Sequence, residues 1–445
     1  MKRHHMPRML AGLVLAAVSW AAQAALPIEH WVHSSGARVY LVRSPAIPML
    51  DLTLDVDAGS RRDPAGRVGL ARATAALFDK GVAAHGHEAA LDENGLAEAW
   101  LDLGAQFGAS AGSDRMSFSL RTLTDPALLE RAVALAARQL AGPAFPDTVW
   151  ARERERSIAA LREAETRPGT QAGRAFSRAV YQGHPYGAQT TAESLNAIAV
   201  ADMAAFYRQH VVACGARVSL VGAVDRATAD RVVGRLMDAL QPNGCRTQPA
   251  VPEVQPLAQA SHQAIPFKAA QAQVLLGQPG IRRDDPDFLV LLVGNHILGG
   301  GGFNSRLMTE VREKRGLTYG AYSGFSPGRH AGAFTVSLQT RPDQAQAALD
   351  LAREVVARYV AEGPTEAELQ AAKDELIKGF ALRLDSNRKL LDNVANLAWN
   401  DLPLDYLDTW TSRVAAFTVD DVRRALQRVL VPGRMASVVV GGTAP

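Results

Sequence analysis

An internal repeat constrains the fold of this chain more than any other feature of its sequence. Three pairs of similar segments recur in the same order along the 445 residues, at an offset of 218 or 219 residues. The pairs are Ile198–Met203 with Phe417–Val422, Ser219–Gly222 with Val438–Gly441, and Phe118–Thr122 with Val336–Thr340. Such a constant offset predicts two copies of one fold of about 200 residues.

A segment rich in proline separates the two copies. Residues 248–260 contain several prolines and show no hydrophobic period, which is typical of a linker. We therefore expect a first lobe at residues 25–245, a linker at 246–261 and a second lobe at 262–445.

Strand-like and helix-like segments alternate within each copy. We expect strands at 38–42, 50–56, 115–120, 218–221, 272–277 and 333–340, and helices at 69–80, 128–140, 150–165, 225–240, 288–298 and 344–361. Neighbouring strands with long helices on one side predict an α+β fold, made of two homologous α/β sandwich lobes joined by a linker.

The N-terminus has the pattern of a signal peptide. Lys2, Arg3 and Arg8 precede the apolar run 9–20, and the small residues of Ala22-Gln-Ala24 follow. We expect residues 1–24 to be a cleaved signal and the protein to be exported, to the periplasm if the source is a Gram-negative bacterium. An N-terminal membrane anchor is the alternative. After residue 24 no run of 18 apolar residues occurs, so we expect no membrane span once the signal is cleaved.

Charge and composition exclude several classes of function. The whole chain has 48 basic and 45 acidic residues, and cleavage of the signal removes three of the basic ones. The mature chain is therefore formally neutral, which argues against binding to nucleic acid or to a membrane surface. Hydrophobic residues at 47% and charged residues at 21% are normal for a globular protein and argue against disorder.

The chain has two cysteines, Cys214 and Cys245. Cys214 lies just before a predicted strand, and Cys245 follows the helix that we expect to return alongside it. An exported protein matures in an oxidising compartment, so we expect a Cys214–Cys245 disulfide, with two buried thiols as the alternative.

Several short motifs resemble the family of pitrilysin, insulinase and the mitochondrial processing peptidase, whose active members are inverted-motif zinc peptidases. The resemblance covers nearly all of the mature chain. The motifs are Gly69-Leu-Ala71, Lys80-Gly81, His184-Pro-Tyr-Gly187 and Val221-Gly222 in the first copy, and the segments 298–307 and 311–319 in the second.

The resemblance fails at the zinc motif. In active members a His-x-x-Glu-His helix follows Gly-Leu-Ala, because histidines four residues apart share one helix face and the glutamate activates the zinc-bound water. Arg72, Ala75 and Ala76 occupy those positions here, and Arg162 aligns with the third ligand. These side chains cannot bind zinc or act as a base. The sequence therefore predicts a degenerate site and no cofactor in this chain.

Two other histidine motifs do not restore a metal site. His85-Gly-His87-Glu88 has no evident third group of ligands, so we interpret it as a solvated loop. His184 begins His-Pro-Tyr-Gly, which is typical of a turn, so we expect a structural role.

The second copy retains a motif for binding substrate. The resemblance implies that an arginine and a tyrosine seven residues apart, here Arg312 and Tyr319, reach the substrate at the zinc of another lobe. An arginine can hold a peptide carbonyl and a tyrosine can stabilise an oxyanion. Arg315 is a weaker candidate. The glycines 299–302 lack the rest of a phosphate loop, so we expect a closely packed turn.

These features predict a non-catalytic, substrate-binding subunit of a zinc peptidase. The resemblance implies a homologous partner that carries the zinc, and peptides or unfolded proteins that bind as added strands at a sheet edge. Three alternatives stay open: a stand-alone peptide-binding protein, a structural subunit, and an active peptidase with an unrecognised site.

Overall fold

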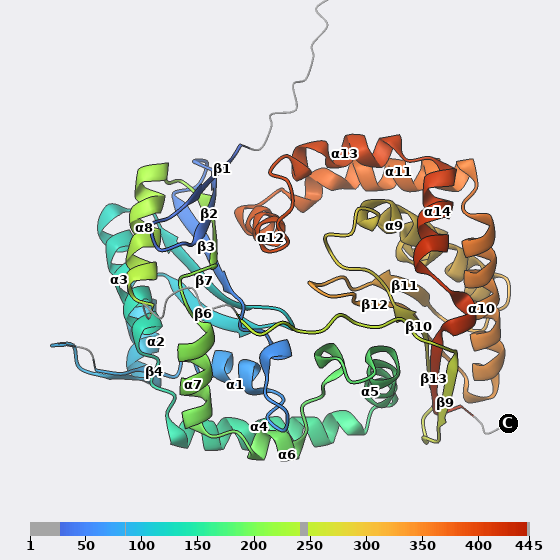
Figure 1. Ribbon diagram of the computed structural model, residues 1–445, viewed down its shortest axis with the longest axis horizontal. Coiled ribbons are helices and arrows are strands. Elements are labelled where there is room, and N and C mark those ends of the chain that lie inside the picture. Colours follow the sequence, from blue (N-terminus) through green and yellow to red (C-terminus); the bar gives the residue numbers. More distant parts are fainter. Residues whose placement is uncertain (1–26, 85, 241–247, 443–445) are drawn as a thin grey trace, which may run out of the picture.

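The computed structural model describes residues 27–84, 86–240 and 248–442, and these form two lobes that lie side by side (Figure 1). The strands of the first lobe are β1 (Ile28–Val32), β2 (Arg38–Arg43), β3 (Met49–Val56), β4 (Gly81–Val82), β5 (Leu91–Asp92), β6 (Gln106–Ala111), β7 (Met116–Leu123) and β8 (Arg217–Gly222). Those of the second are β9 (Ser261–Ile265), β10 (Ala272–Pro279), β11 (Ala321–Phe325), β12 (Ala333–Thr340) and β13 (Ala436–Val440).

The helices alternate with these strands. The α-helices before the linker are α1 (Leu70–Ala76), α2 (Glu93–Asp102), α3 (Pro126–Ala141), α4 (Asp147–Glu165), α5 (Pro168–Tyr181), α6 (Ala192–Asn196), α7 (Val200–His210) and α8 (Arg226–Asp238). Those after it are α9 (Phe288–Asn295), α10 (Ala345–Glu362), α11 (Glu366–Phe380), α12 (Asn387–Trp399), α13 (Tyr406–Ala416) and α14 (Val419–Val429). Short helical turns are η1 (Ser60–Arg62), η2 (Pro185–Gly187), η3 (His296–Gly300), η4 (Gly302–Asn304), η5 (Met308–Glu313), η6 (Pro342–Gln344), η7 (Ala381–Arg383) and η8 (Pro432–Arg434).

The two main sheets have the same topology, except that β1 of the first has no counterpart among the described strands of the second. The first has the order β1-β2-β8-β3-β7-β6, and the second, written in the same direction, has β9-β13-β10-β12-β11. β8 runs parallel to β2 and antiparallel to β3, and β13 runs parallel to β9 and antiparallel to β10. The repeated segments Ser219–Gly222 and Val438–Gly441 thus lie at equivalent strands. The predicted α+β fold with two homologous lobes is confirmed.

The lobes exchange one helix each. α5 belongs to the first half of the chain, yet its residues Ala172, Ala175 and Phe176 pack against β10 and β13 of the second sheet. α12 begins 219 residues after the start of α5, at the equivalent position of the repeat, and it packs in return against β8 and β3 of the first sheet. Figure 1 shows α5 beside the second sheet and α12 beside the first.

This exchange corrects our expectation that helices cover one side of each sheet. In the first lobe α3 and α8 cover the outer face, where alternate residues of β7 such as Phe118 and Leu120 are fully buried. The other face of each sheet is covered by the helix from the other lobe. The sequence pattern of α5 and α12 contains no sign of which sheet they cover.

The predicted helix at 69–80 is shorter than expected. α1 begins after Gly69, whose φ of 109° favours glycine, and ends at Ala76. Gly81, with a φ of 136°, then turns the chain into β4. Among the described residues, no helix is long and apolar enough to cross a bilayer.

The disulfide prediction falls partly outside the described residues. Cys214 lies in the segment before β8 and is disulfide-bonded. Cys245 is outside the described residues, so the pairing of these two cysteines stays a prediction.

Candidate functional site

The degenerate zinc motif lies on α1, beside β6. Ala75, at the position of the catalytic glutamate, is buried with 4% of its surface exposed. Arg72 and Ala76, at the positions of the two histidines, are exposed. The helix therefore presents a guanidinium and methyl groups where a metal would need imidazoles.

A carboxylate holds the start of this helix. Asp63 accepts hydrogen bonds from the backbone N–H groups of Gly69 at 2.7 Å and Ala71 at 2.8 Å. Burial raises the pKa of Asp63 to about 6, against the effect of those two bonds and of the Arg72 charge. Both carboxylate oxygens of Asp63 are thus used by backbone N–H groups at the start of α1, so Asp63 cannot replace the missing zinc ligands.

The other predicted positions do not assemble a metal site either. Arg162 lies exposed near the end of α4, and His87 and Glu88 are exposed in the loop before β5. His85 is outside the described residues. Within residues 27–84, 86–240 and 248–442, no group of three or more His, Cys, Asp or Glu side chains is arranged to hold a metal ion.

The second lobe places Arg312 against an aromatic ring. Arg312 lies on η5, and its guanidinium carbon is 4.7 Å from the ring centroid of Phe303. Phe303 is 64% exposed although it is a large apolar residue. A guanidinium over a phenyl ring is held by a cation–π interaction, which restricts its orientation while leaving its N–H groups available.

Close packing requires three of the four glycines before Phe303, and backbone conformation favours the fourth. A Cβ at Gly299 would lie 2.5 Å from Ser323 N, one at Gly300 would lie 2.7 Å from Asn295 Nδ2, and one at Gly301 would lie 2.7 Å from a backbone oxygen. Gly302 has room for a Cβ but a φ of 63°. The predicted closely packed turn is confirmed, and it presents Phe303 to solvent.

Tyr319 is the most exposed of the large hydrophobic side chains, at 83%. It lies two residues before β11, and Tyr322 on that strand is also exposed. Arg315 is exposed in the turn between η5 and Tyr319. The roles of Arg312, Tyr319 and Arg315 stay predictions, but all three side chains are free to meet a ligand.

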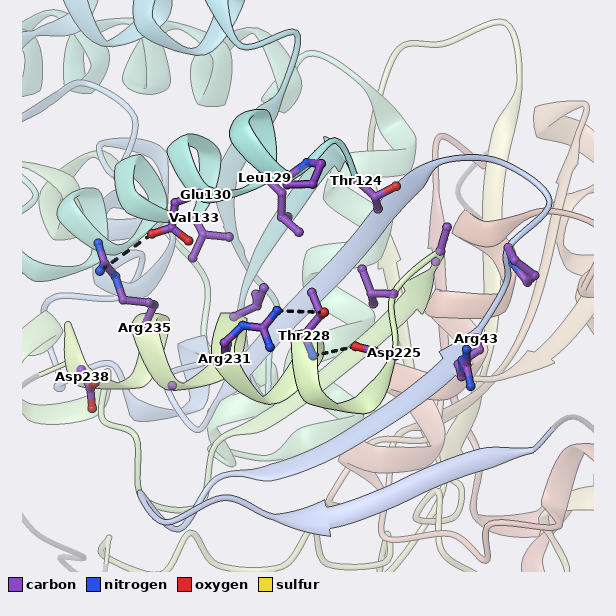
Figure 2. A pocket seen from close by; sticks show the side chains of 17 residues that line it. Arg43, Thr124, Leu129, Glu130, Val133, Asp225, Thr228, Arg231, Arg235 and Asp238 are labelled. Atoms are coloured by element: carbon purple, nitrogen blue, oxygen red, sulfur yellow. Dashed lines mark hydrogen bonds and ion pairs between the residues drawn. The ribbon is translucent and has the colours of Figure 1, made fainter.

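A separate pocket of about 840 Å³ opens between α3 and α8 on the outer side of the first lobe. Figure 2 shows Arg43, Arg231 and Arg235 around it, with Arg235 paired to Glu130 at 3.9 Å. Glu130, Asp225 and Asp238 balance those three cations. The pocket contains no residue of α1 or of the second lobe, so it is not part of the predicted site.

Comparison with known proteins identifies the family. The protein family described as the peptidase M16 inactive domain matches residues 197–376 of the sequence. The crystal structure of a peptidase M16 inactive domain from Pseudomonas fluorescens is 35% identical, with a TM-score of 0.88, over 94% of this chain and 98% of that one. This chain belongs to the M16 peptidase family.

Two further proteins match over different lengths. An uncharacterized zinc protease of Streptomyces coelicolor is 32% identical over 261 residues, which are 57% of this chain and 55% of that protein. The periplasmic protease PqqL from Escherichia coli is 18% identical with a TM-score of 0.77, and this chain covers 49% of it. The second of these supports the fold alone.

The two M16 lobes differ at their sheet edges, which the sequence did not reveal. β11 is the end strand of the second sheet, but its outer edge is covered by its own lobe. Asn295 Nδ2 donates to Ser323 O at 3.0 Å, and Ala321 N lies 3.3 Å from Met308 Sδ. These contacts leave little room for an added strand at Ala321 and Ser323.

β6 is the end strand of the first sheet, and α1 packs beside it, but in the described part of the chain no contact like those of Asn295 and Met308 caps its outer backbone groups. Gly112 N donates to Arg115 O and continues the ladder with β7, so the backbone groups of Phe107, Ala109 and Ala111 point away from it. We find no hydrogen-bond partner for those outward groups in the described part of the chain. By the repeat offset of 219, the residue at the position of Asn295 is Ala76, which has no amide to offer.

Sequence reasoning missed Phe303 and Asn295. An apolar residue directly after a glycine run is a signal for an exposed, presented side chain, and it could have identified Phe303. The role of Asn295 depends on a contact between α9 and β11, which no local pattern encodes.

Proposed function

We propose that this chain is the non-catalytic, peptide-binding subunit of an exported zinc peptidase. The observation that carries the proposal is the contrast between the two lobes. Arg72, Ala75 and Ala76 leave α1 without zinc ligands, whereas Arg312 and Tyr319 in the second lobe keep the family spacing and are open to a ligand. In this proposal a homologous partner supplies the zinc and this chain supplies the two side chains.

The chemistry assigns different tasks to the two residues. Arg312, oriented by Phe303 at 4.7 Å, donates N–H groups to a peptide carbonyl in the bound substrate. Tyr319 keeps its hydroxyl exposed, and it would donate to the oxyanion that develops on the attacked peptide carbonyl, while the partner's zinc would supply the activated water. The peptide is held as an extended strand, because the outer edge of β6 has free backbone groups.

The test is reconstitution with a homologue that carries an intact His-x-x-Glu-His motif. We expect no cleavage of an unstructured fluorogenic peptide by this chain alone, and cleavage by the pair. In the pair, Tyr319→Phe should lower kcat on the order of 10²-fold, and Arg312→Ala should act more strongly on KM.

A matched control is Arg424→Ala, which removes an exposed arginine of α14 that pairs with Asp421 in its own helix. It should leave both constants unchanged. If the two site variants also leave the pair at the wild-type rate, Arg312 and Tyr319 are structural. If the lone chain, stripped of metal, cleaves the peptide, the non-catalytic assignment is wrong.

The open edge of β6 favours one second candidate, a stand-alone peptide-binding protein. Strand addition at that edge requires no partner. Binding of the labelled peptide by the lone chain, with no gain in affinity and no cleavage when zinc-bearing homologues are added, would support it.

A further inference from the structure

The hairpins that contain the two edge strands meet at their tips. The turn Gly112–Arg115 joins β6 to β7, and the loop Ser326–Gly332 joins β11 to β12. Arg329 N in that loop donates to Asp114 Oδ2 at 3.0 Å. The backbone of the second-lobe hairpin is thus held by a carboxylate at the tip of the first-lobe hairpin.

Tyr186 makes this contact a three-way junction. Its hydroxyl donates to Asp114 Oδ1 at 2.5 Å and accepts from His330 N at 3.2 Å. Burial, and then the bond to Asp114, raise the pKa of Tyr186, so the hydroxyl keeps its proton and stays a donor. Gly328 is enclosed as well, because a Cβ there would lie 2.5 Å from the Tyr186 hydroxyl and 2.8 Å from Asp114 Oδ2.

The first-lobe side of the junction is fixed by its own neighbours. Arg61, buried on η1, lies 3.1 Å from Asp114 Oδ1, and Ser60 N donates to Gly112 O at 2.9 Å. A Cβ at Gly59 would lie 2.4 Å from the backbone of this turn. The turn therefore cannot shift toward η1.

The His184-Pro-Tyr-Gly motif builds the platform for Tyr186. His184 Nδ1 accepts from Tyr186 N at 3.1 Å and caps η2, and the other ring nitrogen of His184 lies 2.9 Å from Pro252 O in the linker. The motif thus joins three parts of the chain, namely the first lobe, the linker and, through Tyr186, the second lobe.

We propose that Asp114 and Tyr186 are positioning residues that couple the two edge hairpins mechanically. The junction fixes the open edge of β6 relative to β11, the strand that follows Tyr319. Its consequence for peptide binding rests on the proposed function, whereas the coupling itself does not.

Hydrogen exchange measured by mass spectrometry on the full chain tests the coupling. In Tyr186→Phe, and independently in Asp114→Asn, we expect amides in both hairpins, residues 106–116 and 321–334, to exchange at least about tenfold faster than in the wild type. Gly328→Ala should do the same by forcing the loop away from Asp114.

Tyr359→Phe is the matched control, because it removes a buried hydroxyl that donates to Gly294 O at 2.9 Å within the second lobe. It should leave both hairpins at the wild-type exchange rate. Faster exchange in only one hairpin, in neither, or equally in the control would overturn the proposal.

Peptide affinity, measured by fluorescence anisotropy with the labelled unstructured peptide, separates this proposal from the proposed function. If the wild-type chain binds no peptide but both hairpins respond to Tyr186→Phe, the coupling stands and the peptide-binding function fails. If the wild type binds peptide and the hairpins do not respond together, the function stands and the coupling fails.

Discussion

Arg217 Nη2 lies 2.9 Å from Asp401 Oδ2, and this ion pair joins β8 of the first lobe to the residue that follows the end of α12 by two positions. Arg217 is also one of three arginines that surround Trp399. The guanidinium carbons of Arg115, Arg217 and Arg329 lie 5.5, 5.2 and 4.8 Å from its ring. Two of these arginines come from the first lobe and one from the second, so this tryptophan is a structural centre between the lobes.

Replacing the tryptophan should therefore destabilise both lobes together. Trp399 is almost fully buried, and Trp399→Ala removes the ring and its cation–π contacts, so we expect a loss of about 3–5 kcal/mol in the free energy of unfolding. Denaturant unfolding followed by circular dichroism measures this. Trp399→Phe should lose clearly less, and an alanine variant with wild-type stability would contradict the role of the ring.

A buried histidine should make stability depend on pH. Burial, and then repulsion by Arg62, lower the pKa of His210 to about 4 from its usual 6.5. As the pH falls, the unfolded chain therefore binds the extra proton at a higher pH than the folded chain does. The contribution of His210 to the free energy of unfolding is complete above pH 6.5 and is lost as the pH falls towards 4. The loss is on the order of 3 kcal/mol.

Asp63 acts in the opposite direction over part of this range. Its pKa of about 6 lies above the usual 3.8, so its contribution is present at low pH and is lost as the pH rises from about 4 to 6. The difference between wild type and His210→Phe isolates the histidine. Parallel stability curves for the two proteins between pH 4 and 6.5 would refute its assignment.

An amide introduced beside the edge of β6 should weaken peptide binding. Ala76 lies on α1 at the position that corresponds to Asn295 in the second lobe. Ala76→Asn should therefore place an amide against the free backbone groups of β6 and weaken peptide binding about tenfold. Ala159→Asn on the exposed surface of α4 is the control. Fluorescence anisotropy with a labelled unstructured peptide measures the affinity. Unchanged affinity in Ala76→Asn would exclude β6 as the peptide edge.

The glycine turn should not tolerate small additions. Gly299→Ala would place a methyl group 2.5 Å from Ser323 N in a buried position, and we expect a loss of about 1–3 kcal/mol in stability. Gly324→Ala, where an added Cβ meets nothing within 4 Å, is the control and should be close to neutral. Thermal unfolding distinguishes them, and equal transition temperatures would show that the turn can relax.

Purified protein should contain no stoichiometric zinc. Arg72, Ala75 and Ala76 replace the two histidines and the glutamate that the site needs. Elemental analysis after dialysis measures the metal content. About one tightly bound zinc per chain would mean that other side chains form a site.

The repeat offset predicted more of this structure than any single motif. It placed β8 and β13 correctly, because both are central strands that are buried along nearly their whole length and so keep the same short apolar run. It could not reveal that α5 covers the second sheet and α12 covers the first. The apolar stripe of a helix shows that the helix packs against an apolar surface, but not which surface that is. The contacts of Asp114 could not be predicted either. An aspartate in a turn usually faces solvent, and the partners of Asp114 are 72 and 215 residues away in the sequence.

The exchange of α5 and α12 separates the unit of sequence duplication from the unit of folding. A fragment cut at the linker would keep one complete copy of the repeat but would carry a helix without its sheet and a sheet without its helix. The second half would expose the apolar face of its sheet that includes Leu275 and Val438. The first half would expose the faces of β3 and β8 that α12 covers in the intact chain. Such halves would be insoluble alone and would recover a native state only by complementing each other, so the gene tolerates division far less well than its symmetry implies.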